Sequence, residues 1–110
     1  MMEISHSEVA PETVVVKLAG KLMLGREGDR MVTLVEDLIS QGKRLFVFDL
    51  AEVGAIDSTG IGRFISSFNK ILAAGGEMRM AGARGHVFQS FRVSLLDKVF
   101  RFYPNVDAAL

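Results

Sequence analysis

The feature of this sequence that most limits the fold is the run Leu45–Leu50 (LFVFDL), which begins with four consecutive apolar residues. A strand with one exposed face alternates apolar and polar residues, so an unbroken apolar run indicates a strand covered on both faces. Farther along, apolar residues recur at the spacing of one helix face. These residues are Ile61, Phe64, Ile65, Phe68, Ile71 and Leu72. A covered strand followed by an amphipathic helix predicts an α/β fold.

The rest of the chain divides into strand-like and helix-like segments at glycine and proline residues. Strands are predicted at Met2–Val9, Thr13–Ala19, Glu77–Ala81 and Lys98–Tyr103, the second ending at Gly20 and the last forming an edge. Helices are predicted at Asp29–Ser40, His86–Leu96 and Asn105–Leu110. In the first of these helices Asp29 is the expected N-cap and Gly42 the expected C-cap. In the second, the residues expected to face inward are Val87, Phe88, Phe91 and Leu95.

The resulting element order is β-β-α-β-α-β-α-β-α, and the length of 110 residues predicts a single domain over residues 1–110. Strands that alternate with helices pair in parallel through right-handed crossovers. The first two strands are separated only by a turn at Pro11-Glu12, so they are expected to pair antiparallel. The prediction is therefore a mixed sheet of four to five strands with an N-terminal β-hairpin and about four helices.

Composition removes several classes of function. Thirteen basic and thirteen acidic side chains cancel, so no overall field favours direct binding to nucleic acid. The chain has no cysteine and only two histidines, which excludes thiol chemistry, and no metal or cofactor is expected. No stretch approaches the ~20 apolar residues that span a bilayer, and the N-terminus lacks a signal-peptide pattern. We therefore expect a cytoplasmic protein without membrane insertion, and the lack of a long exposed apolar stripe favours a monomer.

The segment Ala51–Phe64 (AEVGAIDSTGIGRF) follows the central strand, and loops at the carboxyl ends of such strands carry the functional sites of α/β sheets. Ser58 has two interpretations: it is the N-cap of the following helix, or a hydroxyl that accepts a phosphate. Asp57 is either a turn residue that binds backbone N–H groups or a group that orients Ser58. Thr59 is expected at the first helical position, where its hydroxyl bonds locally.

Two further features of this segment suit protein binding. Gly60 and Gly62 have no side chains, so the backbone of another protein can approach closely. The polar face of the following helix lies beside Ser58 and is the predicted docking surface. Its residues are Arg63, Ser66, Ser67 and Lys70.

Other chemistries have weaker support. A serine hydrolase would need a base beside Ser58, but the motif is not G-x-S-x-G, and His86 lies on a predicted helix. Asp49 resembles the acceptor aspartate of a receiver domain, but the acidic pair that would hold magnesium is missing. The run Gly60-Ile61-Gly62 is shorter than a nucleotide-binding fingerprint. Most phenylalanines are assigned to the core rather than to base stacking, namely Phe46, Phe48, Phe64, Phe68, Phe88 and Phe91.

The run FDLAEVGAIDSTGIG resembles the signature of STAS domains, the family of sulphate-transporter C-terminal domains and bacterial anti-sigma factor antagonists. The signature is a strand ending in D-L, a short loop, and then I-D-S-[ST]-G-[LI]-G. The resemblance extends over most of the chain. It includes Gly20, Gly75-Gly76, the segment Leu96–Phe100 and the terminal run Asp107–Leu110.

The resemblance implies a protein-binding switch with no catalysis of its own. It implies that Ser58 is phosphorylated by an anti-sigma factor that is also a serine kinase of the histidine-kinase ATPase fold. The unmodified protein would bind this factor and free a sigma factor, and a PP2C-type phosphatase would restore the unmodified form. ATP would be the substrate of the kinase. The residues implied in partner binding are Asp57, Ser58, Thr59, Gly60, Ile61, Gly62 and Arg63.

The resemblance leaves two points open. Many antagonists carry an acidic G-E-L-D where this chain has Gly20-Lys21-Leu22-Met23, so its partner or its affinity differs if those acids contact the kinase. The same domain also serves in stressosome-like assemblies, in a phospholipid-transport complex and in transporter tails. The alternative function is therefore that of a STAS subunit in a lipid-transport or stressosome-like complex, without phosphorylation.

Overall fold

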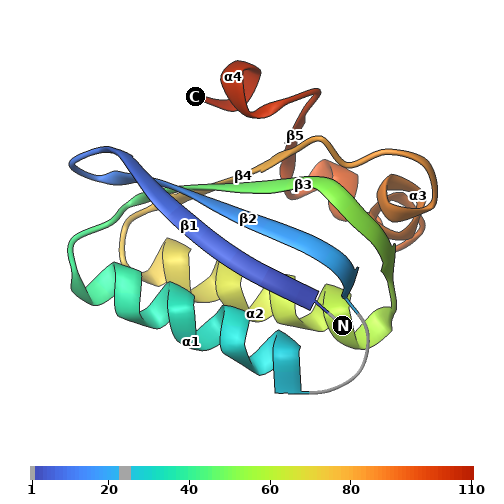
Figure 1. Ribbon diagram of the computed structural model, residues 1–110, viewed down its shortest axis with the longest axis horizontal. Helices are drawn as coiled ribbons and strands as arrows, with labels where there is room; N and C mark the ends of the chain where they lie inside the picture. The colour runs from blue at the N-terminus through green and yellow to red at the C-terminus, as the bar shows by residue number, and fades with distance from the viewer. Residues whose placement is uncertain (1, 23–25) are drawn as a thin grey trace.

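The computed structural model describes residues 2–22 and 26–110. Five strands form one mixed sheet in the order β1-β2-β3-β4-β5, in which β1 pairs antiparallel with β2 and the other neighbours are parallel (Figure 1). The strands are β1 (Met2–Ala10), β2 (Thr13–Leu22), β3 (Leu45–Ile56), β4 (Glu77–Ala81) and β5 (Arg101–Tyr103). The helices are α1 (Arg26–Ser40), α2 (Ser58–Ala73), α3 (Gly85–Val93), the 3-10 turn η1 (Leu96–Lys98) and α4 (Val106–Ala109). The predicted α/β class, element order and N-terminal hairpin are confirmed.

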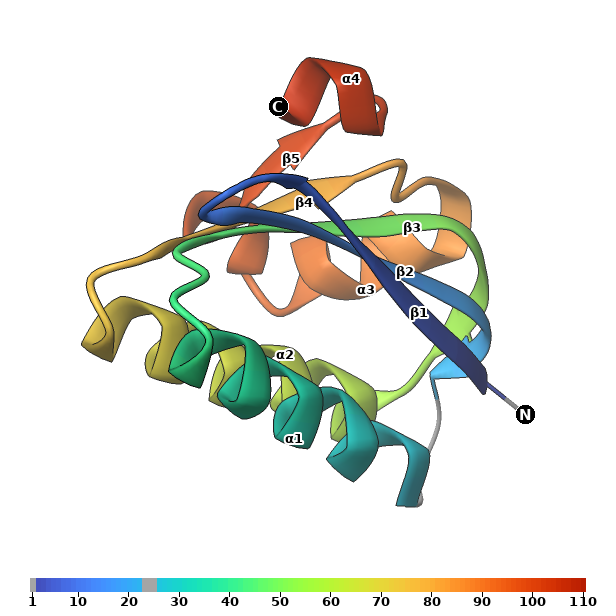
Figure 2. The same ribbon diagram turned by 60° about the vertical axis from the view of Figure 1, so that its left-hand side comes forward.

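Helices pack against both faces of the sheet, but one face is covered more fully than the other. Helices α1, α2 and α3 cover one face, and the short α4 lies over the other (Figures 1 and 2). On the three-helix side, the ring of Phe64 packs edge-on between those of Phe48 and Phe91, with centroids 5.5 and 5.4 Å away. On the other side, Val47 packs with Ala109 of α4. The apolar run that starts β3 is therefore covered on both faces, as the sequence predicts.

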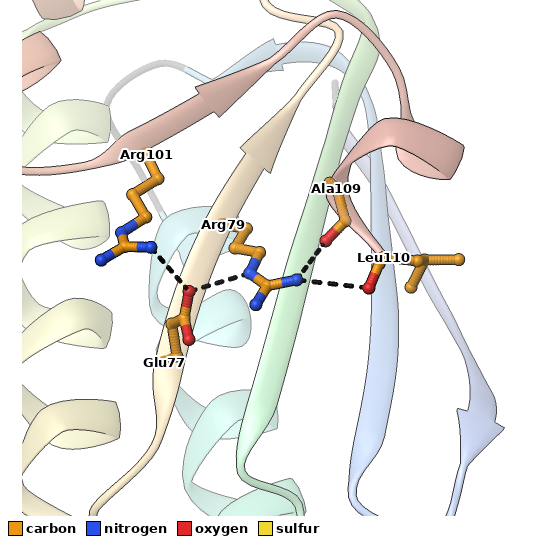
Figure 3. Close-up of polar contacts among 5 residues, drawn as sticks. All are labelled: Glu77, Arg79, Arg101, Ala109 and Leu110. Carbon is orange, nitrogen blue, oxygen red and sulfur yellow. Dashed lines mark hydrogen bonds and ion pairs between the residues drawn. The ribbon is translucent and has the colours of Figure 1, made fainter.

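A polar contact holds α4 against the sheet. Arg79 of β4 donates from its guanidinium to the carbonyl oxygen of Ala109 at 2.7 Å and to the carboxylate of Glu77 at 2.8 Å (Figure 3). The guanidinium of Arg101, on the neighbouring strand, lies 3.8 Å from the same carboxylate. The hydrogen bond from Arg79 lowers the pKa of Glu77, since it favours the charged form. The sheet face under α4 thus carries a small charged network beside its apolar contact.

Two strand ends differ from the prediction. Strand β3 does not end at Leu50 but continues to Ile56, so the first half of the segment after Leu50 is strand and not loop. Strand β2 does not end at Gly20 either: Gly20 has a φ of +95°, and the register shifts between Gly20 and Lys21 before pairing resumes. The additional residues of β2 and β3 pair with each other. The pattern within one segment does not reveal such pairing between segments.

Two predictions about the first two helices were wrong. Asp29 is not the N-cap of α1, because the helix already begins at Arg26. On α2, the buried face is rotated from the predicted one: Ile65 and Leu72 are exposed, whereas Ser67, assigned to the polar face, is fully buried. The rotation follows from the packing of α2, which lies against α1 as well as against the sheet.

The segment after α3 also differs from the prediction. Leu95 does not face inward: α3 ends at Val93, and Leu95 has a φ of +62° and a side chain that is 64% exposed. Leu96 packs against the core instead. Strand β5 is shorter than predicted, because Lys98 belongs to the turn η1. In the described ranges, no helix is long and apolar enough to cross a membrane.

Candidate functional site

The segment predicted to be functional lies where β3 passes into α2, at the carboxyl edge of the parallel strands (Figure 1). Asp57 is the residue between the two elements, in an extended conformation with a φ of −110°. Its carboxylate Oδ1 accepts a hydrogen bond from the backbone N–H of Gly60 at 2.9 Å, and its own N–H donates to the carbonyl of Leu22 at 3.2 Å. Asp57 is thus the N-cap of α2, and it also ties the helix start to the end of β2.

This geometry corrects the assignment of the cap to Ser58. A cap side chain reaches the N–H group two or three residues later, and it is Asp57 that makes this bond. Ser58 is the first residue of the helix and is exposed, while Thr59 follows it half-buried. The hydroxyl of Ser58 therefore lies on the surface, at the end of a helix where the backbone dipole favours negative charge.

The two glycines of the motif differ in their surroundings. A Cβ on Gly60 would lie 2.3 Å from the carbonyl oxygen of Leu22 and 2.9 Å from the side chain of Ile56. The space beside Gly60 is thus filled by the chain itself, because α2 starts in close contact with the end of β2. A Cβ on Gly62 would meet nothing within 4 Å. Of the two, only Gly62 leaves open room for another molecule.

Ile61 and Arg63 connect this segment to the rest of the domain. Ile61 is buried, with 8% exposure, and belongs to the main core. Arg63 is half-buried, and its Nη2 lies 2.9 Å from the carboxylate of Asp29 on α1. Its Nε is buried and has no hydrogen-bond partner among the described residues. The residues predicted for partner binding are therefore contiguous in space, but Gly60 and Ile61 are buried beneath the surface.

A groove of about 370 Å³ runs between the start of α2 and helix α3. On the α2 side its walls are Ile56, Asp57, Ser58 and Ile61, and on the α3 side they are His86, Gln89, Ser90, Val93 and Ser94. The α3 residues other than His86 were missed by sequence reasoning. They lie more than two dozen positions after Ser58 in the chain, and no local motif links them to it. Only the packing of α3 on the sheet brings them to this site.

The structure places the two residues considered for other chemistries, His86 for a serine hydrolase and Asp49 for a receiver-type acceptor. His86 lines the same groove as Ser58, but the two side chains form no hydrogen bond in the described part of the chain. Asp49 accepts a hydrogen bond from the backbone N–H of Ala51 at 3.1 Å. Within residues 2–22 and 26–110 there is no group of three or more His, Asp or Glu side chains placed to hold a metal ion.

The run Gly20-Lys21-Leu22, which replaces the acidic G-E-L pattern of many antagonists, lies at the sheet edge where β3 passes into α2. Lys21 is exposed and pairs with Ala55, and Leu22 pairs with Ile56 directly before Asp57. Met23, the second departure, lies outside the described residues. Lys21 thus lies one residue before Leu22, whose carbonyl accepts the N–H of Asp57 at the start of α2.

Comparison with solved structures shows several similar folds. The anti-sigma factor antagonist SpoIIAA in its unphosphorylated form superposes with a TM-score of 0.81 at 19% identity, over 93% of this chain and 89% of that one. The phosphorylated form of the Bacillus SpoIIAA gives a TM-score of 0.74 at 18% identity, over 93% and 92%. An anti-sigma factor antagonist from Mycobacterium paratuberculosis gives 0.84 at 17% identity, over 99% and 91%.

A protein of a different group is equally similar. A sulfate transporter family protein from Wolinella succinogenes gives a TM-score of 0.82 at 19% identity, over 94% of this chain and 86% of that one. At these identities the structures show a common fold. The family itself is shown by the sequence: the family model of the STAS domain matches residues 6–109. With that match over nearly the whole chain and the fold that accompanies it, the chain belongs to the STAS domain family.

Proposed function

We propose that this domain is an anti-sigma factor antagonist whose binding to its partner is switched by phosphorylation of Ser58. The observation that carries the proposal is that the residue capping α2 and the residue exposing a hydroxyl at its start are different. Asp57 supplies the cap, and Ser58 presents an exposed hydroxyl at the first helical position. A phosphate on Ser58 therefore leaves the capping bond intact and changes the surface rather than the fold.

The partner in this proposal is an anti-sigma factor that is also a serine kinase of the histidine-kinase ATPase fold. Unmodified protein binds the factor through the surface that includes Ser58, Thr59, Gly62 and Arg63, and so frees a sigma factor. A PP2C-type phosphatase reverses the modification. Support comes from the family match and from the similar SpoIIAA, whose structure exists in unphosphorylated and phosphorylated forms.

The energy needed for such a switch is modest. A phosphate adds a charge of about −1.5 to −2 at pH 7. Each tenfold loss of affinity corresponds to about 1.4 kcal/mol, and a charge placed in a desolvated interface without a partner costs more than that. In this proposal the domain acts by binding, without catalysis, as a cytoplasmic monomer that forms a single domain over residues 1–110.

The test is phosphorylation by a purified partner. The wild-type protein is incubated with a kinase-type anti-sigma factor of the source organism and ATP, and the modified residue is mapped by mass spectrometry. We expect to find phosphate on Ser58 of the wild type. It should be absent from Ser58→Ala and still present in the matched control Thr59→Ala. In a binding titration Ser58→Asp is expected to lose at least about tenfold in affinity. Absence of phosphate together with wild-type binding by Ser58→Asp would refute the switch.

A second candidate is a subunit of a lipid-transport or stressosome-like complex that binds its partner without being modified. The observation that keeps it open is the similarity to the sulfate transporter family protein, because this fold is not confined to antagonists. In this case Ser58→Asp still weakens binding, but protein purified from its native cells carries no phosphate on Ser58. Intact-mass measurement of the native protein separates the two candidates.

A further inference from the structure

The two most exposed large apolar side chains in the described part of the chain are Val93 and Leu95, at the end of α3. Val93 is 71% exposed and Leu95 is 64% exposed, and Val99, a few residues on, is 52% exposed. Single exposed apolar residues are common, but here three of them lie within seven positions of one segment, where another molecule can contact them together. We call Arg92, Val93 and Leu95 the α3 ridge.

The backbone at the α3 ridge has an unusual conformation. Leu95 is the only non-glycine residue with a positive φ among residues 2–22 and 26–110. Its N–H donates to the carbonyl of Arg92 at 2.9 Å, so the conformation is held by the turn that ends α3. A glycine adopts this conformation without strain. Strained residues concentrate at functional sites, so the side chain of Leu95 is expected to contact another molecule.

The α3 ridge meets the surface assigned to partner binding at Val93. Val93 lines the groove whose opposite wall includes Ser58 and Ile61. Figure 1 shows α3 beside the bend at which β3 passes into α2, and Figure 2 shows the same closeness from another side. A protein that covers Ser58 therefore reaches the end of α3 as well, without extending over a new face of the domain.

The charge at this place indicates what the partner carries. Helix α3 has the sequence GHVFQSFRV, which contains His86 and Arg92 and no acidic residue, and Arg84 precedes it. All three of these side chains are exposed. The charged groups of this segment are Arg84 and Arg92, and the first acid after Leu95 is Asp97 of η1. Apolar side chains next to arginine are complementary to apolar side chains next to carboxylates.

We propose that the α3 ridge is the second half of the docking surface for the ATPase-type partner. The partner places an apolar side chain against Val93 and Leu95, and it directs acidic side chains toward Arg92. This inference rests on the proposed function, and it names the residues that decide which partner is accepted. Ser58 reports the phosphorylation state, whereas the α3 ridge provides affinity that does not depend on phosphate.

The experiment is a calorimetric titration of unphosphorylated protein with a purified histidine-kinase-fold ATPase of the source organism that binds the wild type. Leu95→Gly relieves the backbone strain and removes the side chain, so its melting temperature is expected to stay the same or rise while the affinity falls at least about tenfold. Val93→Glu is expected to lose at least as much. The matched control is Leu72→Glu on α2, whose side chain is 50% exposed, and it is expected to bind as the wild type does.

The outcomes separate this inference from the proposed function. If Ser58→Asp abolishes binding but Leu95→Gly and Val93→Glu bind as tightly as the wild type, the α3 ridge has no role and the switch stands. If no such ATPase binds the wild type, both proposals fail. A further variant, Arg92→Glu, is expected to weaken binding and to reduce its dependence on salt, because a charge pair across the interface is lost. An unchanged salt dependence would contradict the acidic chemistry assigned to the partner.

Discussion

The carboxylate of Asp57 lies 2.9 Å from the backbone nitrogen of Gly60, and this bond caps α2 independently of Ser58. The capping residue is therefore Asp57, and the residue proposed for modification is its neighbour Ser58. The hydroxyl of Ser58 takes no part in the capping bond, and the separate contributions of the two residues can be tested through stability alone.

Replacement of Asp57 by alanine is expected to destabilise the domain by about 1 kcal/mol, because an N–H group at the helix start loses its acceptor. Ser58→Ala is expected to change stability by less than about 0.5 kcal/mol, as for other exposed positions. Urea unfolding followed by circular dichroism measures both. Asp29→Ala, at the position that sequence alone assigns to a cap, serves as control and removes only the exposed ion pair with Arg63. A larger loss in Ser58→Ala than in Asp57→Ala would contradict the assigned cap.

The glycines of the motif provide a matched pair of substitutions. Gly60→Ala places a methyl group 2.3 Å from the carbonyl of Leu22, so the start of α2 must move away from β2, and a loss of at least about 2 kcal/mol is expected. Gly62→Ala has open space around it and lies within the helix, where alanine is favoured by about 1 kcal/mol. Thermal melting of the two variants should therefore shift in opposite directions. Equal shifts would mean that the contact between Gly60 and Leu22 does not exist.

The buried hydroxyl of Ser67 suggests a stabilising substitution. Ser67 is fully buried on α2, and its Oγ has no hydrogen-bond partner among the described residues. Ser67→Ala removes this unpaired group with little change in volume and is expected to stabilise the domain by up to about 1 kcal/mol. Chemical denaturation measures the change. Ser66→Ala, at the adjacent and less buried position, is the control, and a clear loss in Ser67→Ala alone would show that the hydroxyl is satisfied in solution.

A negative charge at Ser58 is expected to be compatible with folding. In Ser58→Asp the new carboxylate lies at the first position of α2, where the helix dipole stabilises it by about 0.5 kcal/mol. Asn69→Asp adds the same charge in the second half of the same helix, where the dipole is unfavourable, and a small loss is expected. Comparison of the two melting temperatures at low salt, and again at high salt where the difference should shrink, checks the argument. Unfolding of Ser58→Asp would remove the basis for a surface switch.

The network around Arg79 predicts a pH dependence. The hydrogen bond from Arg79 lowers the pKa of Glu77 below its ordinary value of 4.5, so the folded state favours the charged carboxylate. This contribution is fully present above pH 4.5 and is lost as the pH falls through the lowered pKa. Because Glu77 is partly exposed, about 0.5 kcal/mol is expected. Wild type and Glu77→Gln should therefore differ in stability near neutral pH and converge in acid, and parallel curves at all pH values would contradict the role of the pair.

Much of the fold follows from patterns that are local in the chain. The apolar run at Leu45–Phe48 predicts a strand covered on both faces, and the alternation at Glu77–Ala81 predicts a strand with the bounds that the structure has. Strong periodicity and glycine stops act within a few residues, so they can be read without knowing what the segment contacts. The cap is harder to assign, because Asp57 and Ser58 are both good capping residues and a shift of one position exchanges their roles.

Tertiary structure decided what depends on residues far apart in the chain. The continuation of β3 to Ile56 requires the bulged end of β2, and the burial of Ser67 requires the packing of α1 against α2. The groove at Ser58 has a second wall only because α3 packs on the sheet next to the start of α2. The sequence alone thus determined the layered fold and singled out Ser58. Packing between distant segments decided which neighbours Ser58 has, since no local pattern records a contact made across the sheet.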